Sequence, residues 1–69
     1  MMGRQSTANK VREFLAQNKD VVKKLEDLED NDRANVISAV NESIKSMRGV
    51  TPAKMRLEFL RYIEMATNE

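Results

Sequence analysis

The densest group of side chains that could support chemistry is acidic. Residues 26–32 hold five carboxylates and no Lys or Arg: Glu26, Asp27, Glu29, Asp30 and Asp32. Carboxylates this close together could act as a general acid–base pair or as oxygen ligands for calcium. A calcium loop of the EF-hand type ends on glutamate at its twelfth position, whereas a loop that starts at Asp27 or Asp30 ends on Ser38 or Asn41. We therefore interpret the cluster as a solvated turn that faces the positive end of a following helix.

The chain of 69 residues contains no cysteine and no histidine, which narrows the chemistry further. Nucleophilic catalysis needs a side chain activated by a neighbouring base, and histidine is the most frequent such base and a frequent metal ligand. A carboxylate pair would need a concave, partly desolvated site, for which a domain of this size has little room. We expect a protein that is not an enzyme and that uses no metal or cofactor.

A second concentration of charge is basic and lies nearer the C-terminus. Residues 45–61 hold five basic side chains against one acidic one: Lys45, Arg48, Lys54, Arg56 and Arg61. Gly49-Val50-Thr51, followed by a helical pattern, is similar to the turn of a DNA-binding helix-turn-helix. In that arrangement Lys54 and Arg56 would enter the major groove, while Lys45 and Arg48 would contact phosphates. DNA-binding transcriptional regulation is therefore one hypothesis for the function.

Two positions depart from the helix-turn-helix pattern. Lys45 stands four residues before Gly49, where a small residue is usual, and Glu58 stands nine residues after it, where an apolar residue is usual. The net charge of +1 also gives little general attraction to nucleic acid, whose nonspecific binding depends on phosphate contacts. For these reasons DNA binding ranks second among our hypotheses.

Helical periodicity predicts the elements that would hold these side chains. Apolar residues recur at intervals of three and four in three segments, which predict helices over residues 7–28, 32–48 and 51–67. Because the loops are short, we expect consecutive helices to be antiparallel neighbours in an all-α, compact three-helix bundle. Residues 1–5 show no pattern and are expected to form a flexible tail ahead of a single helical domain over residues 6–69.

Asn18 leaves one alternative open in the first helix. It occupies an apolar-seam position between Val11 and Leu25, and the apolar period continues through it. We favour one continuous helix because the period is unbroken. The alternative is a break at Asn18-Lys19-Asp20, where Asn18 or Asp20 caps a second short helix and the bundle has four helices. Asparagine at a seam position can also fix the register of an oligomer.

The connection between the last two predicted helices has the clearest local signals. Gly49 can adopt the left-handed conformation that ends a helix, and Thr51 can accept a hydrogen bond from a free backbone N–H of the next one. Pro52 suits the first helical position. Val50 and Met55 are spaced as a hydrophobic staple. Together these residues predict a short, well-specified corner.

The last helix carries more apolar surface than a single seam of a three-helix bundle requires. Tyrosine and methionine are enriched at protein interfaces, and neighbouring basic residues would steer an acidic partner. Our leading hypothesis is a small regulator or adaptor that binds the acidic and apolar surface of another protein through five residues: Arg56, Phe59, Tyr62, Ile63 and Met65. Burial of all the apolar members within one chain would remove this surface. Self-association into a homo-oligomer would add buried area to so small a domain.

The C-terminal residues Arg61-Tyr62-Ile63-Glu64-Met65-Ala66-Thr67-Asn68-Glu69 resemble the tail of the anti-sigma proteins of T4-like bacteriophages. Those proteins are small all-helical regulators that bind the sigma subunit of host RNA polymerase. The resemblance covers nine of the 69 residues and implies a small helical regulator, without assigning any binding residue.

The sequence also bears on location in the cell. No apolar run is long enough to span a bilayer, and Met1-Met2-Gly3-Arg4-Gln5-Ser6 lacks the apolar core of a signal peptide. We expect a cytoplasmic protein that does not bind membranes.

Overall fold

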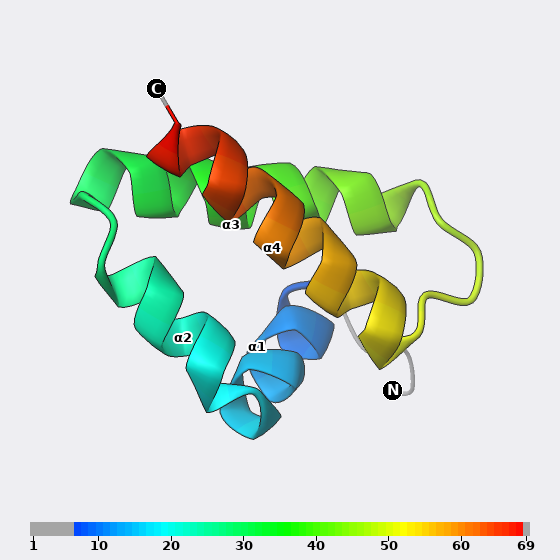
Figure 1. Ribbon diagram of the computed structural model, residues 1–69. Coiled ribbons are helices and arrows are strands. Elements are labelled where there is room, and N and C mark those ends of the chain that lie inside the picture. Colours follow the sequence, from blue (N-terminus) through cyan, green and yellow to red (C-terminus); the bar gives the residue numbers. More distant parts are fainter. Residues whose placement is uncertain (1–6, 69) are drawn as a thin grey trace.

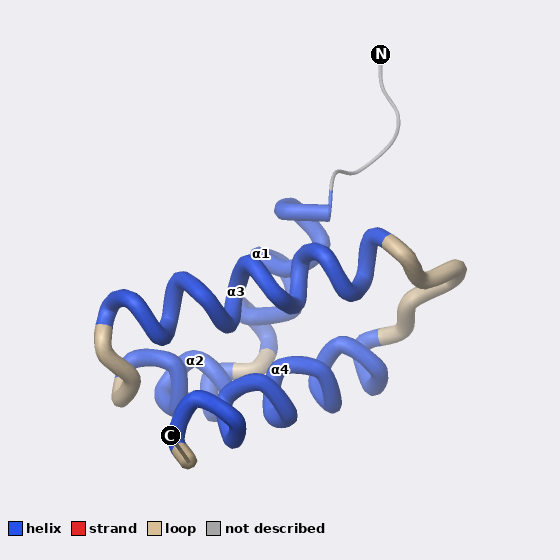
Figure 2. The backbone as a smooth tube through the Cα atoms, turned by 90° about the horizontal axis from the view of Figure 1, so that it is seen from above, coloured by secondary structure: helices blue, strands red, loops and turns tan. Residues whose placement is uncertain are grey.

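The computed structural model describes residues 7–68, and within that range the chain forms four α-helices and no strand. They are α1 (Thr7–Gln17), α2 (Lys19–Glu26), α3 (Asp30–Lys45) and α4 (Pro52–Thr67) (Figure 1). α3 and α4 run antiparallel, and α1 and α2 lie together on one side of that pair (Figure 2). The expected all-α fold is confirmed. The expected N-terminal tail at residues 1–5 lies outside the described residues.

The favoured continuous helix over residues 7–28 is wrong, and the four-helix alternative with its break near Asn18 is confirmed. Each side of the break contributes to the same core, with Val11 and Phe14 buried from α1 and Val21 and Leu25 buried from α2. A straight helix would carry one of these two pairs away from α3 and α4. Tertiary burial therefore overrides the unbroken period of the sequence.

The hydrogen bonds around Asn18 show how the break forms. Its Nδ2 donates to the Phe14 carbonyl at 2.8 Å, which is the carbonyl that the residue 18 N–H would use in a continuous helix. The Asn18 N–H donates to Leu15 O at 3.2 Å instead, and its backbone leaves the helical region with φ −127° and ψ 72°. The Asn18 carbonyl then accepts from the N–H groups of Val21 and Val22, which begins α2. The Asn18 side chain thus ends α1 by binding the Phe14 carbonyl, and it makes no capping hydrogen bond to α2.

The core is apolar and draws on all four helices. Among the described residues, ten are buried in it: Val11, Phe14, Val21, Leu25, Val36, Val40, Ile44, Met55, Phe59 and Ile63. No polar or charged side chain is buried among the described residues. The rings of Phe14 and Phe59 are stacked, with centroids 5.5 Å apart and planes within 3°, so they join α1 to the centre of α4.

The corner between α3 and α4 has the local features that the sequence predicts. Gly49 is left-handed, with φ 61°. Thr51 Oγ1 accepts the Lys54 N–H at 3.2 Å, and Pro52 is the first residue of α4. Val50 packs against the core in which Met55 is buried. α3 ends at Lys45 rather than near residue 48. The N–H groups of Ser46 and Met47 donate to the carbonyls of Ser43 and Ile44, three residues back, and not four residues back as in an α-helix.

The acidic cluster lies at the connection between α2 and α3. Asp30 and Asp32 fall in the first turn of α3, where carboxylates are stabilised by the helix dipole, and Lys45 falls in its last turn. Over residues 7–68, no group of three or more carboxylates is placed to hold a metal ion. None of the described helices combines the length and the hydropathy that crossing a bilayer requires.

Candidate protein-binding surface

The five residues predicted to bind a partner point in different directions from α4. Phe59 is fully buried and Ile63 is 7% exposed, so both hold α4 on the core and offer little or no surface to a partner. Tyr62 is half-buried, and Met65 is 57% exposed. What remains open from the predicted apolar set is therefore the pair Tyr62 and Met65.

Tyr62 and Met65 line a shallow groove of about 230 Å³ between the first half of α3 and the last half of α4. We call it the α3/α4 groove, and its lining residues are Asp32, Asn35, Val36, Ala39, Tyr62, Met65 and Ala66. Two of these are alanines, one on each helix, and their short side chains leave space between the helices. The groove therefore has an apolar floor with a flexible, exposed methionine at its edge.

Charges of both signs stand beside the α3/α4 groove. Asp32 and Asn35 form part of its α3 wall. On the α4 side, the Arg61 guanidinium carbon lies 5.8 Å from the centroid of the Tyr62 ring, a cation–π contact. Arg61 is exposed and forms no salt bridge with any described carboxylate. A ligand could thus place an apolar group in the groove and an anionic group near Arg61.

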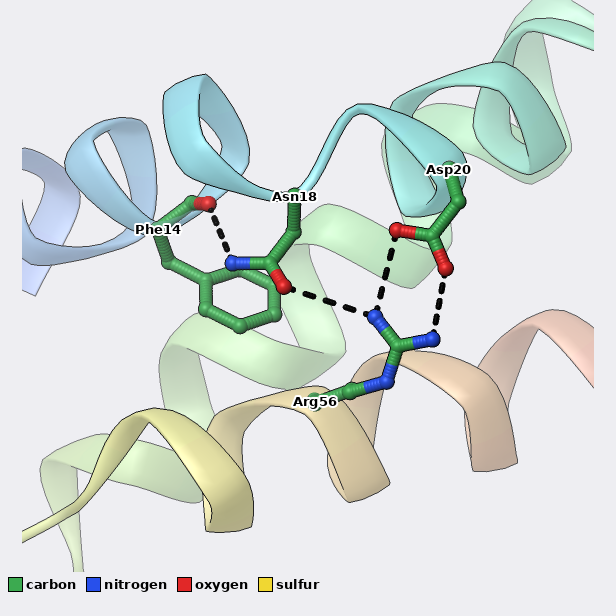
Figure 3. A network of polar contacts seen from close by, with 4 residues as sticks. All are labelled: Phe14, Asn18, Asp20 and Arg56. Carbon is green, nitrogen blue, oxygen red and sulfur yellow. Dashed lines mark hydrogen bonds and ion pairs between the residues drawn. The ribbon is translucent and has the colours of Figure 1, made fainter.

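Arg56, the remaining predicted residue, faces the break between α1 and α2. Its guanidinium nitrogens donate to both carboxylate oxygens of Asp20, at 3.2 and 2.5 Å, and to Asn18 Oδ1 at 3.4 Å (Figure 3). We call Phe14, Asn18, Asp20 and Arg56 the hinge network. The hydrogen bonds from Arg56 hold the pKa of Asp20 below its usual value and raise the pKa of Arg56 in turn. Arg56 is therefore engaged within the fold.

Three of the four predicted DNA contacts are exposed near the corner between α3 and α4. They are Lys45, Arg48 and Lys54. Lys45 is paired with Glu42 at 3.4 Å, and Arg56 lies in the hinge network instead of with these three residues. Glu58, which departs from the helix-turn-helix pattern, accepts a hydrogen bond from Ser43 Oγ at 2.9 Å and so links α4 to α3.

A second hollow, of about 190 Å³, lies between α1 and the start of α4. Its apolar lining includes Phe14 and Met55, which are only 6% and 5% exposed. Lys10, Glu13 and Gln17 form polar parts of its lining. Phe14 and Met55 therefore serve the core, whereas Met65 in the α3/α4 groove is 57% exposed.

Two parts of the exposed surface escape the sequence prediction. Leu57 is 66% exposed, and a strict period through Met55 and Phe59 could have placed it on the outer face of α4. The α3 wall of the groove lies far from α4 in the sequence. Its residues Val36 and Ala39 fit the α3 pattern, but no local signal says which helix they face.

No protein-family model, curated protein or solved structure matches this chain.

Proposed function

We propose that this chain is a non-enzymatic protein-binding module, a cytoplasmic regulator or adaptor, and that its partner docks in the α3/α4 groove. The observation that carries the proposal is Met65, whose exposed side chain stands beside the half-buried Tyr62 ring at the groove edge. Methionine adapts its shape to a partner, and tyrosine contributes strongly to interface energies. A small domain that leaves both accessible has an apolar surface available for binding.

The partner that fits this groove is an acidic, amphipathic segment of another protein. One of its apolar side chains would lie between Tyr62 and Met65, and a carboxylate would approach Arg61. Lys54 and Arg61 are both exposed on α4 without a salt bridge among the described residues. Such exposed cations increase association rates with acidic partners and make them dependent on salt.

Two exposed apolar residues on α4 give a matched pair for the test. Met65→Asp places a charge at the groove, whereas Leu57→Asp places the same charge on a comparably exposed position outside it. Wild type and both variants would be used for affinity capture from nuclease-treated native cell extract, followed by titration of the protein recovered. We expect Met65→Asp to weaken binding at least ~10-fold, the effect of losing one interface hot spot, and Leu57→Asp to leave it unchanged.

Folding and the outcome against the proposal are checked in the same series. Circular dichroism should show the same helix content for all three proteins, because both positions are exposed. Binding that survives Met65→Asp, or that is lost equally in Leu57→Asp, would place the interface elsewhere.

DNA binding is the second candidate, supported by the exposed cations Lys45, Arg48 and Lys54 near one corner of the molecule. It requires binding to labelled duplex DNA that weakens steeply with added salt and is reduced by Lys54→Ala in a folded protein. Capture that disappears after nuclease treatment would favour this candidate. The absence of duplex binding at low salt would exclude it.

A further inference from the structure

The break between α1 and α2 is not caused by a helix-breaking residue. Residues 7–28 contain neither glycine nor proline, and their apolar period runs through Asn18 without interruption. The chain leaves the helix only at Asn18, and it is helical again from Lys19. The sequence is therefore locally compatible with one straight helix, whereas the fold of a single chain requires a bend.

Side-chain contacts hold the bend. Asn18 Nδ2 donates to the Phe14 carbonyl, and Arg56 of α4 donates to Asn18 Oδ1 and to the Asp20 carboxylate (Figure 3). Asn18 is half-buried, while Asp20 is exposed to solvent. Loss of these contacts would leave only the packing of α1 and α2 on the core to oppose the helical preference of the segment.

α1 contributes to the core through a small, self-contained set of contacts. Val11 and Phe14 are its buried residues, and Phe14 stacks on Phe59 of α4. Nothing in these contacts requires α1 to belong to the same chain as α3 and α4. An α1 helix from a second copy, placed in the same position, would form the same stacked pair and fill the same space.

We propose that two copies of this chain form a dimer by exchanging α1. In each copy the hinge at Asn18 straightens, α1 and α2 become one helix, and Phe14 packs on Phe59 of the other copy. Exchange of an identical element reuses contacts that the monomer already makes, so only the hinge changes. The partner is a second copy of this chain, and the α3/α4 groove takes no part in the exchange.

Two substitutions at the hinge act in opposite directions. Asn18→Ala removes both side-chain bonds of Asn18 and introduces the best helix former, which favours the straight helix. Lys19→Pro favours the bend, because proline is tolerated at the first position of α2 but clashes with the carbonyl four residues back in a continuous helix. The double variant Asn18→Ala/Lys19→Pro is the matched control, since it lacks the Asn18 bonds and still cannot straighten.

Mass and interchain contacts are the readouts. Light scattering after size exclusion should show Asn18→Ala shifting from 7.9 kDa to twice that mass as concentration rises, with a dimer dissociation constant at least ~10-fold below that of wild type. Lys19→Pro and the double variant should remain monomers. In mixed labelled and unlabelled Asn18→Ala, isotope-filtered NMR should show contacts from the Phe14 ring of one chain to the Phe59 ring of the other.

Three results would overturn the exchange. They are a folded Asn18→Ala that stays monomeric at millimolar concentration, a dimer that persists in the double variant, and a dimer without interchain contacts between Phe14 and Phe59. If Asn18→Ala does not fold, wild type and Lys19→Pro are compared at millimolar concentration. A wild-type dimer that Lys19→Pro lacks then supports the proposal, and equal masses refute it.

Discussion

Gly49 allows a test of the corner with two substitutions, L-alanine and D-alanine, that differ only in the configuration at Cα. Its φ of 61° lies in the left-handed region, and a Cβ built on it would meet no atom within 4 Å. Gly49→Ala therefore introduces no clash, and its effect is purely conformational. An L-residue in this region is strained by about 1–2 kcal/mol. The lower entropy of the unfolded alanine chain offsets about 0.4–1 kcal/mol of that strain.

We therefore expect Gly49→Ala to lower the free energy of unfolding by about 1 kcal/mol. In a domain of this size, that loss lowers the melting temperature by about 4–8 °C. The assay is thermal and urea unfolding followed by circular dichroism at 222 nm, with the midpoint and the slope fitted separately, because only a change of midpoint at constant slope reports stability alone.

D-alanine at position 49 is the decisive control, and a chain of 69 residues is within reach of chemical synthesis. D-alanine prefers positive φ, so it should restrict the unfolded chain without strain and raise stability by about 0.4–1 kcal/mol. The two epimers have matching effects on the unfolded state, so their difference isolates the strain. If L-alanine is tolerated as well as D-alanine, Gly49 is not left-handed in solution and our account of the corner fails.

Three further changes test other parts of the fold. Thr51→Ala removes the side chain that accepts the Lys54 N–H and should lower the free energy of unfolding by about 1 kcal/mol, measured by urea unfolding, with Thr51→Ser close to wild type. Because the pKa of Asp20 is lowered in the folded protein, the ion pair with Arg56 stabilises the fold above the usual carboxyl pKa of about 4, and this stabilisation is lost as pH falls through the lowered value. Asp20→Asn should therefore flatten the dependence of the melting temperature on pH in that range, and an unchanged dependence would contradict the pairing. Phe59→Ala empties the centre of the core at a cost of about 3–5 kcal/mol, against a total stability of about 3–10 kcal/mol for a chain of this length, and we expect NMR to show an unfolded or molten chain.

The corner and the hinge differ in how much of each could be predicted from sequence. At the corner, Gly49, Thr51 and Pro52 act on backbone groups within a few residues, so their types and order suffice. At the hinge, the local signals conflict. The apolar period favours a straight helix, and Asn18 can either continue it or compete for the Phe14 carbonyl. The bend wins through packing on α3 and α4 and through Arg56, which is 38 residues away.

The candidate site divides in the same way. The sequence identifies α4 as unusually apolar, but it does not tell which apolar residues of α4 are buried in the core. Phe59 and Ile63 are buried in the core, while Tyr62 and Met65 remain at the surface, because α1, α2 and α3 cover only part of the circumference of α4. The second wall of the groove comes from Val36 and Ala39 of α3. The pairing of α3 with α4 depends on tertiary packing, which the local sequence does not predict.

The unequal exposure of two methionines on α4 also has a consequence in redox chemistry. Met65 is 57% exposed, whereas Met55 is 5% exposed in the core. Peroxide should therefore convert Met65 to its sulfoxide well before Met55, and the sulfoxide replaces an apolar edge of the groove with a polar, chiral group. The rate of this oxidation, followed by mass spectrometry, is an intrinsic reporter of groove occupancy. A partner seated there would slow it without any change to the sequence.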